Sequence, residues 1–261
     1  MHTALTIAGS DSGGGAGIQA DLKTFAAHKV YGTCAITAVT AQNTLGVTMW
    51  RALETDLVTA QIEAVAGDMG AEAVKVGMLA TAAIVEAVAA AIAELDLPHV
   101  VVDPVMVAKG GDRLLEADAV AAIRSELLPL AHIVTPNVPE AEVLAEVRIK
   151  SVEDMRAAGE RILELGPRVV LVKGGHLEGS ESIDMACTRH ETFEVRAPRL
   201  ETAHTHGTGC TLSSAIAANL ALGHDVRTAI TLAREYLDGA LRHAPGIGRG
   251  HGPLQHFWRL Y

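Results

Sequence analysis

Short segments that are apolar throughout alternate with helical patterns along most of the chain, and this alternation constrains the fold more than any other feature. The segments expected as strands are residues 4–8, 33–39, 73–76, 99–102, 132–134 and 168–172. Between them, apolar residues recur every three or four positions, which is typical of helices. Strands that are apolar throughout are covered on both faces, and strands alternating with helices form right-handed βαβ units. The sequence therefore predicts an α/β fold with a mostly parallel central sheet and helices on both faces.

Three segments depart from this pattern. Residues 182–187 and 191–195 alternate polar and apolar side chains, which predicts a small antiparallel hairpin, or flap, at the edge of the sheet. Residues 48–53 are expected to form a small strand off the main sheet. The sequence contains no linker, low-complexity tract or repeat, so we expect residues 1–261 to form a single domain.

Composition narrows the class of protein. The chain is 49% apolar and 20% charged, which excludes a disordered protein, and its net charge of −10 argues against a nucleic-acid or anionic membrane partner. The three cysteines are too few and too scattered for a disulfide framework or a zinc site, which favours a reducing, cytoplasmic location. No apolar run approaches the roughly 20 residues that span a bilayer, and the first residues have no secretory signal pattern.

Glycine clusters and polar residues follow the predicted strands. The clusters lie at residues 13–17, 110–111, 174–175 and 207–209. Ligands of open parallel sheets bind beyond the carboxyl ends of the strands, so these segments predict a site on one rim. Residues 110–111 are expected to belong to a mobile loop that closes over this site.

The segment from Gly207 to Cys210 precedes a nearly all-apolar, buried helix. Two glycines allow several backbone N–H groups to converge where the helix dipole is positive, which makes an anion hole suited to a phosphoryl group. A helix N-terminus also lowers the pKa of a cysteine, so Cys210 is a candidate base or nucleophile. The alternative is an ordinary glycine-rich N-cap in which Thr208 caps the helix and Cys210 is a small buried apolar residue.

Other candidate residues have similar alternatives. Asp103, Asn137 and Glu140 suit a water-coordinated Mg²⁺, although a capping box made by Asn137 and Glu140 is the better interpretation of those two residues alone. Lys173 suits a phosphate, or it is a solvated lysine at a strand end. Gln42 suits an amide-like ligand edge, or it belongs to a turn. Asp21 is either a site residue or an acid in the first turn of a helix.

The first glycine-rich loop matches neither common nucleotide motif. Ile18 stands where a dinucleotide-binding G-x-G-x-x-G fingerprint would need its last glycine, and the Gly-Lys-Ser/Thr of a Walker A loop is missing. An NAD-dependent oxidoreductase is therefore disfavoured.

Taken together, these motifs resemble the hydroxymethylpyrimidine/phosphomethylpyrimidine kinases of thiamine biosynthesis, in the ribokinase-like superfamily. The resemblance covers about residues 4–258. It rests on residues 5–11 (LTIAGSD), 14–24 (GGAGIQADLKT), 41–44 (AQNT), 75–79 (KVGML), 102–106 (VDPVM), 135–137 (TPN) with Glu140 and Ala141, 172–176 (VKGGH), 206–211 (HGTGCT) and 248–253 (GRGHGP).

The resemblance implies a ribokinase-like fold and an ATP-dependent kinase that uses Mg²⁺. Its substrate would be 4-amino-5-hydroxymethyl-2-methylpyrimidine, phosphorylated first on the hydroxymethyl group and then again to the diphosphate. It implies that the pyrimidine contacts Gln42, Asp21, Gly9, Ala16, Met78 and Val105. It implies an anion hole at Gly207, Thr208, Gly209 and Cys210, and it places Asp103, Asn137, Glu140 and Lys173 at the metal and nucleotide, with Asp103 and Glu140 at Mg²⁺ partly through water.

Many sugar kinases of this superfamily have an aspartate as base where this chain has Cys210. Because phosphoryl transfer depends mostly on positioning and charge stabilisation, a weaker base can suffice. The alternatives are a pyridoxal kinase of the same fold, with possible dual activity, and a non-catalytic pyrimidine-binding regulatory protein. Dimerisation is common in the family, and the predicted edge hairpin would allow a homodimer.

Overall fold

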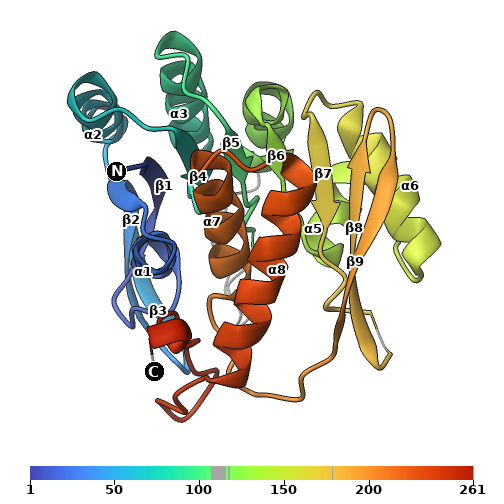
Figure 1. Cartoon of the computed structure of the whole chain (residues 1–261). Helices are drawn as coiled ribbons and strands as arrows, with labels where there is room; N and C mark the ends of the chain where they lie inside the picture. Colours follow the sequence, from blue (N-terminus) through green and yellow to red (C-terminus); the bar gives the residue numbers. More distant parts are fainter. Residues whose placement is uncertain (107–115, 117, 178, 261) are drawn as a thin grey trace.

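The computed structural model describes residues 1–106, 116, 118–177 and 179–260, and Figure 1 shows its elements. The strands are β1 (Thr3–Asp11), β2 (Tyr31–Asn43), β3 (Gly46–Ala52), β4 (Ala73–Val76), β5 (Val100–Val102), β6 (Ile133–Val134), β7 (Val169–Val172), β8 (Glu181–Thr188) and β9 (Thr192–Pro198). The α-helices are α1 (Gly17–Ala27), α2 (Thr55–Asp68), α3 (Ala82–Glu94), α4 (Ala119–Ala122), α5 (Val138–Ala145), α6 (Val152–Leu163), α7 (Thr208–Ala221) and α8 (Val226–Arg242). Three shorter helical turns are η1 (Ile123–Leu127), η2 (Leu128–Leu130) and η3 (Trp258–Leu260).

In the described part of the chain, all the strands join one sheet in the order β3-β2-β1-β4-β5-β6-β7-β8-β9. The six strands from β2 to β7 in this order pair in parallel, whereas β3, β8 and β9 are antiparallel. The predicted parallel sheet and the antiparallel edge hairpin are therefore confirmed. Strands β4 and β7 are buried at every residue, as expected for strands covered on both faces.

The prediction that residues 48–53 lie off the main sheet is wrong. Strand β3 pairs antiparallel with the second half of β2, from Ala38 to Asn43, and forms the edge of the same sheet. β2 is longer than predicted and runs beyond most of the strands beside it. Its outer half therefore leaves backbone N–H and C=O groups unpaired unless another strand covers them.

Helices cover both faces of the sheet. α1, α7 and α8 form one layer, with α7 packed on β1, β4 and β5, and α2, α3 and α6 pack on the other face (Figure 1). Almost all of α7 is buried, as its apolar sequence predicts. Helix α8 was not predicted, although Ala229, Ile230, Ala233 and Leu237 recur at helical spacing and face the core.

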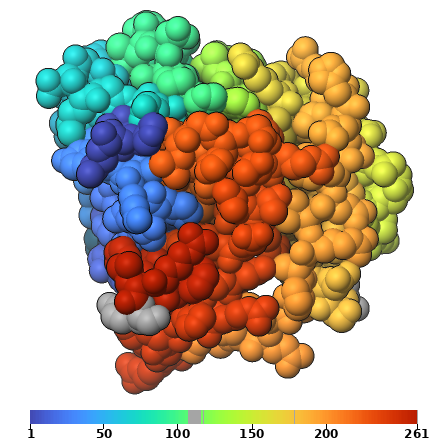
Figure 2. Space-filling model, viewed as in Figure 1, coloured from blue at the N-terminus to red at the C-terminus, as the bar shows by residue number. Residues whose placement is uncertain are grey.

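The end of the chain returns to the α1, α7 and α8 layer. The hydroxyl of Tyr236 donates to the backbone oxygen of His256 over 2.6 Å, and Trp258 Nε1 donates to the backbone oxygen of Tyr236 over 3.2 Å. Figure 2 shows this last segment, in dark red, lying against α1. None of the helices in the described residues is both long enough and apolar enough to cross a membrane.

Candidate active site

A cavity of about 660 Å³ opens at the carboxyl ends of the parallel strands. The predicted rim is therefore confirmed as the place of the pocket. Its lining includes every predicted site residue except Asp21: Gly9, Ala16, Gln42, Met78, Asp103, Val105, Asn137, Glu140, Lys173, Gly207, Thr208, Gly209 and Cys210. The loop at Gly110 and Gly111, predicted to close over the site, lies outside the described residues.

Gly207 makes the turn that aims α7 at the cavity. Its φ of +83° is in the left-handed region, and a Cβ there would lie 1.8 Å from the backbone oxygen of Gly15. Only glycine fits a turn that is both left-handed and in contact with another loop. Thr208 is the first residue of α7, and its hydroxyl donates to the oxygen of Thr205 over 2.6 Å, so the alternative in which Thr208 caps the helix is wrong.

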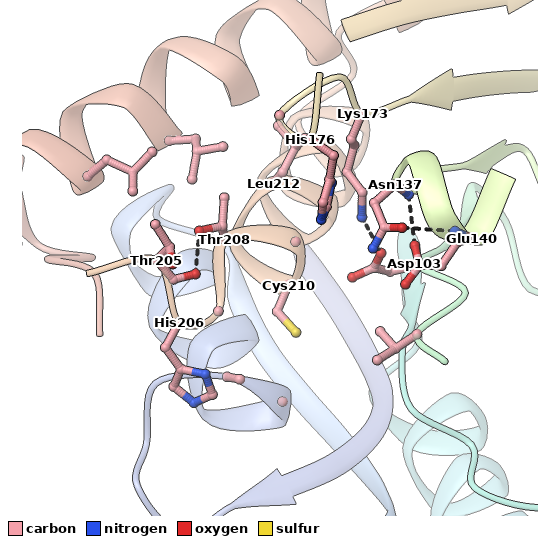
Figure 3. Close-up of a pocket in the computed structure, with 18 of the residues that line it drawn as sticks. Asp103, Asn137, Glu140, Lys173, His176, Thr205, His206, Thr208, Cys210 and Leu212 are labelled. Atoms are coloured by element: carbon pink, nitrogen blue, oxygen red, sulfur yellow. Dashed lines mark hydrogen bonds and ion pairs between the residues drawn. The ribbon is translucent and has the colours of Figure 1, made fainter. Parts of the chain in front are cut away.

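The N-terminus of α7 faces a partly buried ion pair. Lys173 Nζ lies 2.7 Å from Asp103 Oδ1, and a Cβ on Gly209 would lie 3.2 Å from Asp103 Oδ2 and 3.3 Å from Lys173 Nζ. Figure 3 shows Cys210 pointing into the space between His206 and this pair. Burial opposes the charge on Lys173, but Asp103 and Glu140 outweigh it and raise the pKa of Lys173. Lys173 is therefore a fixed cation and not a solvated lysine at a strand end.

Asn137 and Glu140 form the capping box expected from their spacing. The Asn137 side chain accepts from the backbone N–H of Glu140 over 2.9 Å, and Glu140 Oε2 accepts from the backbone N–H of Asn137 over 2.8 Å. Burial is the main reason that the pKa of Glu140 is raised to about 7; Lys173 opposes this rise, and Asp103 adds to it. The capping residues thus also hold a carboxyl group that titrates near neutral pH beside the ion pair.

The carboxylates of Asp103 and Glu140 suit a metal ion that is held through water better than one that they bind directly. Asp103 Oδ1 is engaged by Lys173 and Glu140 Oε2 by the cap, and the described residues contain no cluster of three or more His, Cys, Asp or Glu able to hold a metal. Mg²⁺ keeps several waters and binds through one or two carboxylates plus phosphate oxygens. The donor set therefore fits Mg²⁺ held through water and nucleotide phosphates.

Glu140 makes the stability of the protein depend on pH. Its pKa is raised from 4.5 to about 7 in the folded chain, so the folded state holds this proton more tightly and stability falls as the pH rises between these values. Replacing Glu140 with glutamine keeps the cap, because glutamine also accepts at this position. The urea midpoint should fall between pH 5 and pH 7.5, and this fall should be smaller in Glu140→Gln than in the wild type. Equal falls in both proteins would contradict a raised pKa at Glu140.

The lowered pKa predicted for Cys210 is wrong in direction. Burial raises the pKa of this thiol to about 11, whereas Lys75 and the backbone N–H of Gly17 lower it by less. The helix N-terminus does face the thiol, but the cost of a thiolate away from water is larger. Cys210 therefore keeps its proton at neutral pH in the free protein.

Asp21, which was predicted to contact the pyrimidine, is not among the residues that line the cavity. It lies within α1 rather than in its first turn, and its carboxylate is fully buried. It accepts from the hydroxyls of Thr6 and Ser214, each over 2.6 Å, and pairs with Lys75. Asp21 thus holds Lys75, which lines the cavity, in place.

Three groups of lining residues were given no role in the sequence analysis, although Asp11, Lys75 and His206 stand in its motifs. His206 Nε2 lies 2.9 Å from Asp11 Oδ2, which also accepts from the N–H groups of Gly15 and Ala16; burial alone would raise the pKa of Asp11, but these hydrogen bonds hold it below its usual value. Lys75 could have been noticed because it is a charged residue within the otherwise apolar strand β4. The last group is Arg234 with Asp184, 2.7 Å apart, and its sequence carries no comparable signal.

The comparisons with known proteins give the family. A family model described as phosphomethylpyrimidine kinase matches residues 11–255. The chain belongs to the phosphomethylpyrimidine kinase family. A hydroxymethylpyrimidine/phosphomethylpyrimidine kinase from Synechococcus elongatus is 50% identical over 259 residues, covering 99% of this chain and 98% of the relative. One from Bacillus subtilis is 46% identical, covering 98% and 95%.

Solved structures agree with the family and confirm the ribokinase-like fold predicted from the resemblance. An ADP complex of Bacillus subtilis pyridoxal kinase matches with a TM-score of 0.92 and 38% identity, covering all of both chains. A phosphomethylpyrimidine kinase from Clostridium difficile matches with a TM-score of 0.83 and 44% identity, covering 92% of this chain and 99% of that one. This phosphomethylpyrimidine kinase family member therefore has the fold of two kinds of vitamin kinase.

Proposed function

We propose that the protein transfers the terminal phosphoryl group of ATP to the hydroxymethyl group of 4-amino-5-hydroxymethyl-2-methylpyrimidine, and then to the resulting monophosphate. The observation that carries this proposal is the meeting of the α7 N-terminus, the Lys173–Asp103 pair and Cys210 in one cavity of a family kinase. Family relatives of about the same length carry both activities in their names. A related pyridoxal kinase from Staphylococcus aureus has been solved with ADP and with AMP-PCP, which supports ATP as the donor.

The residues of the central cavity suit the transferred group. Backbone N–H groups at Gly209 and Cys210 belong to the first turn of α7, so they have no partner within the helix and are free to meet phosphoryl oxygens. Lys173 adds a partly buried positive charge next to them. Asp103 and Glu140 would hold Mg²⁺ through water, and the metal would neutralise charge on the nucleotide phosphates.

The pyrimidine belongs at the end of the cavity near β1 and β2. Gly9, Ala16, Met78 and Val105 form small or apolar walls there, and Gln42 presents the polar group. An amide offers a donor and an acceptor side by side, which complements the amino group and ring nitrogen of an aminopyrimidine. Gln42 Nε2 lies 3.4 Å from His206 Nε2 and Gln42 Oε1 lies 3.2 Å from the hydroxyl oxygen of Thr40, so neighbours on both sides limit how the amide can turn.

We assign Cys210 as the base of the first phosphorylation, acting through its thiolate form. Because burial raises the pKa of the thiol to about 11, this form is a small fraction at neutral pH in the free protein. The acceptor of this step is an alcohol that must lose a proton, whereas the acceptor of the second step is a phosphate, largely ionised at neutral pH because its second pKa is about 6. We expect Cys210→Ala to lower kcat of the first step by at least about a hundredfold and that of the second by less than about tenfold. Both steps are measured separately with purified alcohol and monophosphate substrates. Full retention of the first step would remove the base role.

Pyridoxal kinase is the second candidate activity, favoured by structural neighbours with that name at a TM-score of 0.92. Pyridoxal also carries a hydroxymethyl group on a six-membered nitrogen ring. The deciding experiment compares kcat/KM for the pyrimidine alcohol, its monophosphate and pyridoxal with Mg-ATP. We expect the two pyrimidines to be preferred; a higher kcat/KM for pyridoxal would reverse the assignment, and no turnover of any of them would favour a non-catalytic pyrimidine-binding protein.

Two further properties are proposed from the family and the sequence. We expect a homodimer in solution, which sedimentation of the purified protein at micromolar concentration would test. We also expect a cytoplasmic location, because Cys34, Cys187 and Cys210 are all free thiols, as in reducing compartments.

A further inference from the structure

A buried ion pair supports the floor of the pocket. Lys75 Nζ in β4 lies 2.9 Å from Asp21 Oδ2 in α1, and neither side chain has any surface exposed to solvent. Asp21 Oδ2 also accepts from the hydroxyl of Thr6 in β1, and Asp21 Oδ1 accepts from the hydroxyl of Ser214 in α7. The carboxylate is therefore satisfied by one cation and two neutral donors drawn from three different elements.

The ion pair is oriented relative to the cavity. Lys75 is among the residues that line the cavity and Asp21 is not, so the positive end faces the cavity and the negative end lies behind it. Lys75 Nζ has three donor hydrogens, and the described residues provide a hydrogen-bond partner for one of them, Asp21. A Cβ on Gly77 would lie 2.6 Å from this nitrogen, so the backbone after β4 passes close to the ammonium group.

Cys210 lies beside the positive end. Cys210 and Ser214 are four residues apart in α7, so they share one face of the helix, and Cys210 is one turn closer to the cavity. Because the hydroxyl of Ser214 donates to Asp21, the Cys210 thiol one turn earlier on the same face lies beside the Lys75–Asp21 pair. In agreement with this order, Lys75 lowers the pKa of Cys210 more than Asp21 raises it.

Stability does not explain this arrangement. Burying an ion pair costs much of what the attraction between its charges returns, and apolar side chains of similar size often stabilise a fold as well or better. An oriented pair in a site shielded from water, however, exerts a strong field on a neighbouring group that becomes negative. Lys75 is a fully buried cation that lines the same cavity as Cys210 and interacts with its thiol.

We propose that Lys75 is a positioning residue for the phosphoryl transfer, whose charge, held in place by Asp21, stabilises negative charge at Cys210. The catalytic meaning of this inference rests on the proposed kinase function. The effect on Cys210 itself belongs to the free protein, and it can be measured without substrate, nucleotide or metal.

Several charged or polar groups face the thiol, and the test must change only one of them. They are Lys75 from β4, Asp21 and the N–H of Gly17 from α1, Asp103 after β5 and Lys173 after β7. Lys75→Met removes the positive end of the pair and keeps a long unbranched side chain. Thr6→Val is the matched control, because it breaks a hydrogen bond to the same carboxylate and changes no charge.

The experiment measures alkylation of Cys210 by iodoacetamide at pH 8, followed by peptide mass spectrometry, with no ligands present. A rise of one unit in thiol pKa lowers the thiolate fraction about tenfold and raises its nucleophilicity about threefold, so the rate falls about threefold per unit. We expect Lys75→Met to lower the alkylation rate of Cys210 at least about threefold. Thr6→Val should leave this rate unchanged. A role in packing alone predicts the reverse for Lys75→Met, because a loosened site exposes the thiol and speeds its reaction.

Cys34 serves as an internal reference in the same sample. Burial raises the pKa of Cys34, and no charged group contributes, so its alkylation rate should be the same in the wild type and in Lys75→Met. In Thr6→Val the rate at Cys210 is compared with the wild type directly, because Thr6 is the residue paired with Cys34 across β1 and β2. An unchanged or faster reaction at Cys210 in folded Lys75→Met, or equal slowing in Thr6→Val, would overturn the proposal.

A second variant keeps the test decisive if Lys75→Met does not fold with Asp21 left unpaired. Lys75→Met combined with Asp21→Asn removes both charges, and it should still slow Cys210 because Lys75 has the larger influence. An unchanged rate there would equally overturn the proposal. The outcome is separate from the kinase assignment, which fails only if the wild type does not phosphorylate its substrates.

Discussion

Gly207→Ala should lower kcat for both phosphorylation steps by at least about a hundredfold, the usual cost of losing a donor from an anion hole. A Cβ at this position would lie 1.8 Å from the backbone oxygen of Gly15, so the turn or the glycine-rich loop must move. Either movement turns the first N–H groups of α7 away from the transferred phosphoryl group. Steady-state kinetics with saturating ATP and pyrimidine would measure the effect.

Gly223→Ala is the matched control at the other end of the same helix. Gly207 and Gly223 have φ values of +83° and +84°, so alanine is strained to the same degree at both. At Gly223, however, no atom lies within 4 Å of the added Cβ. We expect Gly223→Ala to lose about 1 kcal/mol of stability and to keep its kcat. Similar kcat values in the two variants would show that the α7 turn does not form the anion hole.

Lys173→Met should be the next most damaging change, with kcat reduced about a hundredfold or more, because it removes a fixed positive charge from the site of transfer. It also leaves Asp103 and Glu140 buried beside each other without their cation. Their negative charges would then repel the phosphates of ATP, so KM for ATP should rise as well. Kinetics at varied ATP concentration separates the two effects.

Lys150→Met provides the control for Lys173→Met. Lys150 is an exposed lysine before α6 and does not line the cavity, so its replacement should leave both kcat and KM near the wild-type values. A loss of less than about fivefold in kcat for Lys173→Met would mean that the α7 N-terminus supplies the charge stabilisation without this lysine.

Much of the fold follows from local patterns in the sequence. Runs such as Ala73–Val76 and Val169–Val172 are apolar throughout and become buried parallel strands. Because parallel strands end at the same rim, the polar and glycine-rich residues after them were correctly predicted to gather at one pocket. The strand β3 was misplaced because pairing with β2 depends on how far β2 extends, and local hydrophobicity does not encode that length.

Individual residues of the site were predicted less completely than its place. The glycine at position 207 was expected because a sharp turn before a buried helix needs it. The clash that makes it irreplaceable comes from Gly15, nearly 200 residues earlier. The pairing of His206 with Asp11 was not predicted for the same reason, since nothing in their motifs shows that the fold brings the two side chains within 2.9 Å.

The sequence by itself determined the alternation of strands and helices, the rim that carries the site and the chemistry of the residues there. Only the tertiary structure decided the charge state of those residues. Cys210 was expected to be acidic because of its helix N-terminus, but it is less acidic than a free thiol. Asp21 was expected at the ligand, and the fold pairs it with the buried Lys75. Periodicity and turn residues act over a few positions of the chain, whereas burial and ion pairing depend on elements far apart in the sequence.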